Sequence, residues 1–186
     1  MTKKIIIGIV GLPGSGKSTI AEYLAQKGFF NIKLSSFLEA EAKKNHVTIG
    51  RQSLQDIGNE VRKKYGPSVL AQWAIKKVGT EQKIVIDGIR NLAEIKFLKS
   101  QGDFFLLGIT ADPEVRYRRL LEVKTRVVPR WEDFLKLDAR DKGRGQSRLG
   151  LQLNKCFNQS DDVIKHNGSS PKELYQKIDE MLKKLR

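Results

Sequence analysis

The segment that decides the fold lies near the start of the chain and reads Ile5-Ile6-Ile7-Gly8-Ile9-Val10-Gly11-Leu12-Pro13-Gly14-Ser15-Gly16-Lys17-Ser18-Thr19. Its first six residues form an apolar run that predicts a buried strand. The glycine-rich stretch after them fits the spacing G-x-x-x-x-G-K-[ST], and a helix is expected to begin near Ser18. A strand, a glycine-rich turn and a helix in this order predict a loop that surrounds phosphate groups.

Each residue type in this loop suits the binding of phosphate groups for a chemical reason. Glycines let the backbone turn tightly, so that several N–H groups point at the phosphates, and the helix N-terminus adds partial positive charge. Lys17 is expected to reach the β- and γ-phosphates, Ser18 to bind Mg²⁺ and Thr19 to contact the α-phosphate. ATP or GTP with Mg²⁺ is thus the expected cofactor, held by Gly11, Pro13, Gly14, Ser15, Gly16, Lys17, Ser18 and Thr19.

A second acidic element ends another apolar run, Ile84-Val85-Ile86-Asp87-Gly88. Functional residues of a parallel sheet lie at the carboxyl ends of its strands, and a carboxylate there can help hold the metal. Because Asp-Gly pairs are also common in turns, Asp87 could instead be a turn or cap residue. Next to a phosphate-binding loop, the metal-binding interpretation is favoured, with Ser18 and Asp87 as the predicted Mg²⁺ ligands.

Apolar runs and amphipathic stretches alternate along the rest of the chain, which indicates an α/β domain with a mainly parallel sheet. Strands are expected at 5–10, 29–34, 84–86, 104–109 and 162–164, and helical stretches at 18–27, 37–77, 92–101, 113–124 and 172–185. Between 125 and 150 the apolar runs are few and glycines are frequent, so we expect a mobile insertion there. A length of 186 residues suits a single domain.

Composition limits the partners of the chain. The net charge of +14 favours polyanions, nucleotides or anionic membranes as partners, although the lysines are spread along the chain as on a solvated surface. No apolar stretch approaches the roughly 20 residues of a membrane helix, and no secretory leader is visible. The lone Cys156 forms no intrachain disulfide, and His46 and His166 lack metal-ligand spacing. We expect a cytoplasmic protein without a membrane partner or a structural metal.

Phosphoryl transfer requires arginines from several segments to neutralise the reacting anions. Arg90 follows Asp87 by three residues, and Arg116 and Arg119 lie on one face of the helix predicted after Pro113. These three are candidates for the active site, with solvated surface side chains as the alternative. The later pair Trp131 and Phe134 fits a packing face of a helix better than a platform for a base.

Together these residues resemble the nucleoside monophosphate kinases, and among them the adenylate-kinase-related branch. The resemblance covers nearly the whole chain and rests on Gly11 to Thr19, Gln55-Asp56-Ile57-Gly58, Tyr65-Gly66-Pro67, Asp87-Gly88-Ile89-Arg90, Asp112-Pro113-Glu114-Val115-Arg116, Asp133-Phe134, Asp138-Ala139-Arg140-Asp141 and Asn167-Gly168-Ser169. It implies a P-loop NTPase three-layer sandwich, with a five-stranded parallel sheet, helices on both faces and a short lid. Residues 1–186 would form a single kinase domain, with an acceptor-binding region at about 34–78 and the lid at about 125–148.

The resemblance also implies roles for residues. Transfer would run from ATP·Mg²⁺ to a nucleoside monophosphate, with Lys17, Asp87, Arg90, Arg116 and Arg119 as catalytic residues. The acceptor would be held by Ser35, Arg51, Arg62 and Arg90. Two features depart from the family pattern: Glu39 stands where members commonly have an arginine, and the charge-rich stretch 142–148 does not match the lid.

Two alternatives stay open. A P-loop kinase of another small phosphorylated molecule, above all dephospho-coenzyme A, would share the fold, and the shape of the acceptor pocket near 34–54 would distinguish it. A regulatory ATPase that binds nucleic acid would use the net charge of +14, but only the composition favours it.

Overall fold

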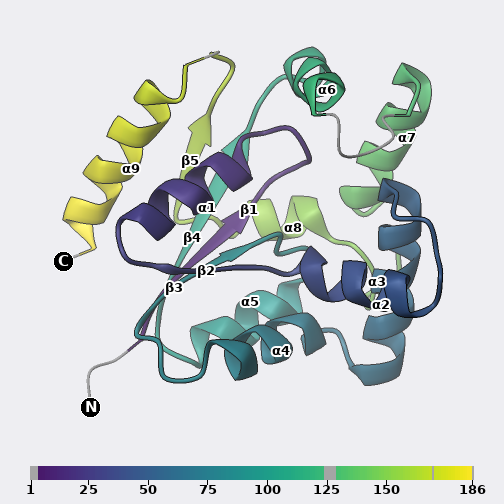
Figure 1. The fold of residues 1–186 in the computed structure, drawn as a ribbon, viewed down its shortest axis with the longest axis horizontal. Helices are drawn as coiled ribbons and strands as arrows, with labels where there is room; N and C mark the ends of the chain where they lie inside the picture. Colours follow the sequence, from purple (N-terminus) through teal and green to yellow (C-terminus); the bar gives the residue numbers. More distant parts are fainter. Residues whose placement is uncertain (1–3, 124–128, 169, 186) are drawn as a thin grey trace.

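The computed structural model describes residues 4–123, 129–168 and 170–185. Five strands form one sheet in the order β2-β3-β1-β4-β5 (Figure 1), and all neighbouring strands are parallel. The strands are β1 (Ile5–Val10), β2 (Phe30–Lys33), β3 (Lys83–Asp87), β4 (Asp103–Thr110) and β5 (Asp162–Lys165). The predicted five-stranded parallel sheet is confirmed, and each expected strand lies within one residue of its predicted bounds.

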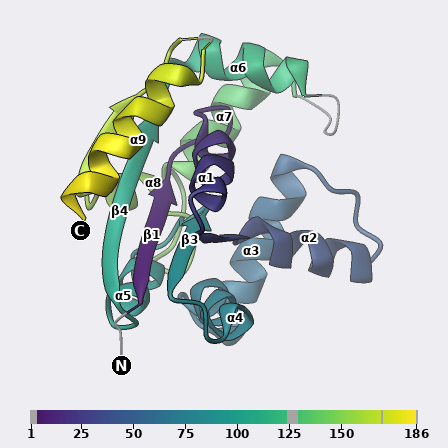
Figure 2. The same ribbon diagram turned by 60° about the vertical axis from the view of Figure 1, so that its left-hand side comes forward.

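Helices cover both faces of the sheet, as a parallel sheet requires (Figures 1 and 2). They are α1 (Lys17–Gln26), α2 (Ser35–Lys44), α3 (Arg51–Tyr65), α4 (Val69–Val78), α5 (Leu92–Lys99), α6 (Pro113–Glu122), α7 (Trp131–Asp141), α8 (Leu153–Phe157) and α9 (Lys172–Lys184). Within the described part of the chain, no helix is both long and apolar enough to cross a membrane.

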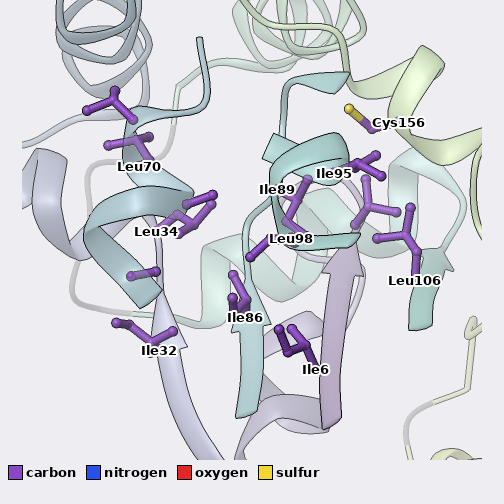
Figure 3. Packing of buried hydrophobic residues seen from close by; sticks show 14 of the residues in the cluster. Ile6, Ile32, Leu34, Leu70, Ile86, Ile89, Ile95, Leu98, Leu106 and Cys156 are labelled. Atoms are coloured by element: carbon purple, nitrogen blue, oxygen red, sulfur yellow. The ribbon is translucent and has the colours of Figure 1, made fainter. Parts of the chain in front are cut away.

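The core lies in two layers because side chains of a strand alternate between its faces. Ile6 of β1 belongs to the layer that contains side chains from α4, α5 and α8, together with Ile86 and Leu106 of the neighbouring strands (Figure 3). Ile7 belongs to the opposite layer, with side chains from α1 and α9. The central strand is therefore held from both sides, which fixes the position of the loop that follows it.

The region between β2 and β3 is helical, as expected, but it forms three helices rather than one continuous stretch. Gly66, with a φ of 97°, and Pro67 separate α3 from α4. Figure 2 shows α2 and α3 standing away from the sheet, on the side of β3. Arg51 and Leu54 of α3 line the same cleft as the loop after β1.

The insertion expected after residue 125 is in part a regular helix. In α7, Phe134, Asp138 and Asp141 are buried. The Phe134 ring packs against Tyr117 at a centroid distance of 5.1 Å and against Trp131 at 5.4 Å, so the packing role predicted for Trp131 and Phe134 is confirmed. Residues 125–128 of the predicted lid lie outside the described residues.

Candidate active site

The backbone of the loop between β1 and α1 depends on its glycines. Gly14 and Gly16 have φ angles of 80° and 105°, in the left-handed region that glycine adopts without strain. At Gly14 a Cβ would also lie 2.5 Å from the carbonyl oxygen of Arg116, which is closer than any real contact. The loop therefore keeps this shape only with glycine at both positions.

Two arginines of α6 donate to backbone carbonyls of the loop. Arg116 is buried and donates to the Pro13 carbonyl at 3.2 Å, while Arg119 donates to the Gly14 carbonyl at 3.1 Å. Arg119 also donates to the carbonyls of His166 and Gly168, in the loop between β5 and α9. Both side chains thus contact backbone carbonyls of the loop, where the sequence predicted contacts with the transferring phosphate.

Lys17 lies at the first position of α1 and is buried, with 9% of its surface exposed. Its Nζ donates to the Leu12 carbonyl at 3.0 Å, across the mouth of the loop. Burial lowers the pKa of Lys17 to about 8, against the opposing effect of Asp87, while Arg90 lowers it further. An anionic phosphate in the loop would supply a negative charge next to Lys17 and would favour its protonated form.

Asp87 is the last residue of β3, next to β1 in the sheet, and is 3% exposed. Its Oδ1 has no hydrogen-bond partner among the described residues, which is costly for a buried carboxylate oxygen. Ser18 lines the same cleft from the start of α1. No group of three metal-binding side chains gathers in the described ranges. A hydroxyl and one carboxylate fit Mg²⁺, which takes its other ligands from phosphates and water.

A cleft of about 620 Å³ runs from this loop toward α3. It is lined by Gly14, Gly16, Lys17, Ser18 and Thr19 of the loop and helix, by Asp87, by Arg119 of α6, and by Arg51, Arg90 and Asp141 on the side of α3 and α7. The structure therefore brings most of the predicted site residues into one cavity. Arg116 does not line it and instead borders a smaller cavity of about 190 Å³ behind the loop.

The far end of the cleft is an ion network around two carboxylates of α7. Asp141 pairs with Arg51 at 2.6 Å and with Arg90 at 2.5 Å. Asp138 pairs with Arg51 at 2.5 Å and with Arg116. These two aspartates join three arginines that come from α3, from the loop after β3 and from α6. Arg116 thus links the network to the phosphate loop.

Asp141 is 1% exposed, and burial alone would raise its pKa. The charges of Arg90 and Arg51 outweigh burial and hold the pKa below the usual value of 3.8. Asp138 and Asp141 are part of the resemblance to the nucleoside monophosphate kinases, which implies no role for them. Their spacing of three residues on one helix face is the signal that could have pointed to a shared partner.

The remaining predicted acceptor residues differ in their surroundings. Ser35 lines the cleft, and its hydroxyl donates to Glu39 at 3.2 Å. Arg62 also lines the cleft but is 1% exposed, and its Nη2 pairs with buried Glu94 at 3.0 Å. Glu39 is thus engaged by a side chain of its own helix, and Arg62 carries an internal ion pair.

Comparison with known proteins agrees with this geometry. The model of an AAA domain family matches residues 7–134. A UPF0200 protein of Sulfurisphaera tokodaii is 31% identical over 97% of both chains. Among solved structures, a Thermus thermophilus protein has a TM-score of 0.63 at 21% identity, covering 99% of both chains. Shikimate kinase from Bacteroides thetaiotaomicron has a TM-score of 0.60 at 14% identity, covering 96% of this chain and 98% of that one.

The family match covers more than half of the chain and includes the phosphate loop, Asp87 and α6. The structural likenesses are below 25% identity and therefore establish the fold, which is that of the P-loop kinases. The nucleoside monophosphate kinase branch is not among the matches described above, so that assignment stays a prediction. The chain belongs to the AAA domain family and to the UPF0200 proteins, and it has a P-loop kinase fold.

Proposed function

We propose that this protein is a kinase that transfers the γ-phosphoryl group of ATP·Mg²⁺ to a small phosphorylated acceptor, with a nucleoside monophosphate as the first candidate. One observation carries the proposal: a single cleft joins the phosphate loop to a second, arginine-lined end. A protein that only hydrolyses a nucleotide needs the first end alone. Arg51, Arg90 and Arg116 outnumber the two aspartates with which they pair, so the network at the second end keeps the net positive charge that a phosphorylated acceptor requires.

In the proposed reaction the loop amides and Lys17 bind the β- and γ-phosphates of the donor. Ser18 and Asp87 would hold Mg²⁺, which neutralises charge on the phosphate oxygens when it is bound. Arg51 and Arg90 bind the acceptor so that its nucleophilic oxygen faces the γ-phosphorus. The bond from that phosphorus to the ADP oxygen breaks as the bond to the acceptor oxygen forms, so transfer depends mainly on placement and charge.

Arg116 and Arg119 have a positioning role in this proposal. Both donate to carbonyls of the phosphate loop, and Arg116 also pairs with Asp138 of α7. By occupying the carbonyls, they favour the backbone orientation in which the amides of the loop face the donor. Arg116 and Arg119 would therefore support the reaction by fixing the shape of the loop, and their positive charges would also lie near the phosphates.

The test is the rate of ADP release from ATP·Mg²⁺ by the purified protein, without an acceptor and with each of several acceptors. The acceptors are AMP, CMP, UMP, GMP, their deoxy forms, dephospho-coenzyme A and shikimate. We expect a nucleoside monophosphate to stimulate release strongly, with the phosphorylated acceptor detected by mass. Stimulation by dephospho-coenzyme A alone would support the proposed kinase activity and replace the nucleoside monophosphate as its acceptor. Slow release that no acceptor changes would overturn the proposal.

A further inference from the structure

Asp138 of α7 is a buried carboxylate that two arginines from different helices share. It is 3% exposed. Its Oδ1 accepts from Arg51 Nη2 at 2.5 Å, and its Oδ2 accepts from Arg116 Nη2. Because each oxygen has a cationic partner of its own, the orientation of the carboxylate and the orientations of the two guanidinium groups depend on one another.

Arg116 uses each of its three guanidinium nitrogens. Its Nε donates to the Ala111 carbonyl at 3.1 Å, its Nη1 to the Pro13 carbonyl at 3.2 Å, and its Nη2 to Asp138. The side chain is 2% exposed, and Asp138 is the charged partner among these three. A guanidinium is planar and rigid, so the direction in which Asp138 holds Nη2 also decides where Nη1 meets the phosphate loop.

An aromatic ring of α7 supports the same two arginines. Phe134 is fully buried, and its ring centroid lies 5.6 Å from Arg51 Cζ and 5.1 Å from Arg116 Cζ. Phe134 precedes Asp138 by four residues, so the ring and the carboxylate lie on one face of the helix. Each guanidinium group thus contacts α7 twice, once through a cation–π contact and once through an ion pair.

Asp141 offers a comparison within the same helix. It is 1% exposed and pairs with Arg51 and Arg90. In the described part of the chain, the side-chain hydrogen bonds of these two arginines do not include a carbonyl of the phosphate loop. Asp138 and Asp141 therefore share charge, burial and one partner, but only Asp138 pairs with Arg116, which contacts the loop.

We infer that Asp138 is a positioning residue for the donor nucleotide, which acts through Arg116 on the Pro13 carbonyl. By holding Arg116 against that carbonyl, Asp138 favours the backbone orientation in which the loop amides face the phosphates. Asp138 is not among the described residues that line the cleft, so it does not act by contact with the nucleotide. The inference rests on the proposed function, since it concerns the donor of that reaction.

A positioning role and a purely electrostatic role predict opposite effects of one substitution. Asp138→Asn keeps the size of the side chain and removes its negative charge. A nucleoside triphosphate is a polyanion, so the loss of a nearby carboxylate would by charge alone strengthen its binding. If Asp138 instead keeps Arg116 in place, the same substitution weakens nucleotide binding. The sign of the change therefore distinguishes the two roles.

The test is calorimetric titration of the full chain with a non-hydrolysable ATP analogue and Mg²⁺, which does not depend on turnover. We expect Asp138→Asn to bind the analogue about tenfold more weakly, the effect of one charge-assisted hydrogen bond. Asp141→Asn makes the same charge change and should bind no more weakly than the parent chain. Asp133→Asn, at an exposed residue of α7 that pairs with Lys136, is the control for an unchanged affinity.

Two results of this titration would overturn the inference. The first is an affinity of Asp138→Asn that equals or exceeds that of the parent chain. The second is an equal loss in Asp138→Asn and Asp141→Asn, because it would reflect the packing of α7 rather than the link to Arg116. Melting temperatures of both variants show whether their stability falls to a similar extent, as expected for two buried ion pairs.

Arg116→Lys gives a second test that keeps a cation beside Asp138. One amino group cannot reproduce the planar fork that reaches Ala111, Pro13 and Asp138, so we expect about a tenfold loss of affinity for the analogue. Adding Asp138→Asn to this variant should cost little more, because Asp138 acts through Arg116. Losses that multiply in the double variant would overturn the inference. Parent-like affinity in Arg116→Lys would also overturn it, even if Asp138→Asn does not fold.

The outcomes separate this inference from the proposed function. Analogue binding that depends on Asp138, in a protein whose ADP release no acceptor stimulates, supports the positioning role and contradicts the kinase. Acceptor-stimulated release together with parent-like analogue affinity in Asp138→Asn supports the kinase and overturns the positioning role. A parent chain that does not bind the analogue overturns both.

Discussion

The two ends of the cleft are built in different ways. The donor end of the proposed kinase is one continuous segment, the loop between β1 and α1, and Arg116 and Arg119 donate to its carbonyl groups. The acceptor end is made of side chains from α3, the loop after β3 and α7, held together by ion pairs. A backbone site recognises what all nucleoside triphosphates share, whereas a side-chain site can change with a few substitutions. In the proposed kinase, the first end would therefore set the chemistry and the second would set the acceptor.

This comparison predicts the largest effect at the donor end. Lys17→Ala removes the cation that spans the donor phosphates, so kcat/KM should fall about 10²- to 10³-fold, and by the same factor for every acceptor. Steady-state kinetics with two acceptors measures this, and melting temperature checks the fold. Lys76→Ala, which changes an exposed lysine of α4, is the control. A loss that differs between acceptors would contradict the assignment of Lys17 to the donor end.

The middle of the cleft should respond to the metal concentration. Asp87→Asn weakens a ligand of the proposed Mg²⁺ site, so the Mg²⁺ concentration needed for half-maximal rate should rise by about 10- to 100-fold. Initial rates at fixed ATP over a Mg²⁺ series test this. Asp133→Asn is a suitable control, because Asp133 is exposed on α7 and pairs only with Lys136 among the contacts described. An unchanged Mg²⁺ dependence would contradict the assignment of Asp87 as a Mg²⁺ ligand.

The acceptor end should show a smaller and more selective effect. Arg90→Ala should raise the acceptor KM about tenfold, the cost of a lost charge-assisted hydrogen bond, and leave the KM for ATP nearly unchanged. Asp141 still pairs with Arg51 in this variant, so the fold should persist. Arg144→Ala removes an exposed arginine and serves as control. Equal increases in the KM of both substrates would mean that the two ends are not separate.

The strand, loop and helix of the proposed donor end could be predicted from the sequence because their residues are contiguous and each residue type has a local chemical reason. Asp87 could be predicted too, since it ends an apolar strand next to β1. The same alternation of apolar and amphipathic stretches predicted all five strands to within one residue. The helical region after β2 was predicted as one stretch over 37–77, although Gly66-Pro67 is a helix-breaking pair and does separate α3 from α4.

The acceptor end could not be predicted in the same way. The partners of Arg51 lie 87 and 90 positions later in the chain, on α7, and only the folded chain brings them together. Gln55 looks like an ordinary polar residue of a helix surface, and its burial follows from the packing of α3 against α7. The sequence thus predicted that Arg51 lies in the cleft, but it did not predict the carboxylates with which Arg51 pairs, because no local pattern indicates them.

The smallest expected effect concerns stability in acid. Arg90 and Arg51 keep the pKa of Asp141 below 3.8 in spite of its burial, and the Gln55 side chain lies next to it. A carboxylate whose pKa is lower in the folded state stabilises the protein above its unfolded pKa and loses this effect as the pH falls through the folded pKa. The melting temperature should therefore decline below about pH 4, near the unperturbed value for Asp.

Asp141→Asn should melt at a lower temperature at neutral pH and show a shallower decline in acid, because its amide does not titrate. Thermal melts between pH 2 and 7 measure both effects. Asp56→Asn is the matched control, because Asp56 forms a solvent-accessible ion pair with Arg140, and such pairs contribute little to stability. If both variants keep the acid dependence of the parent chain, the ion network at the acceptor end does not hold α7 against α3. Altered acceptor binding would then have to come from Arg51 and Arg90 individually.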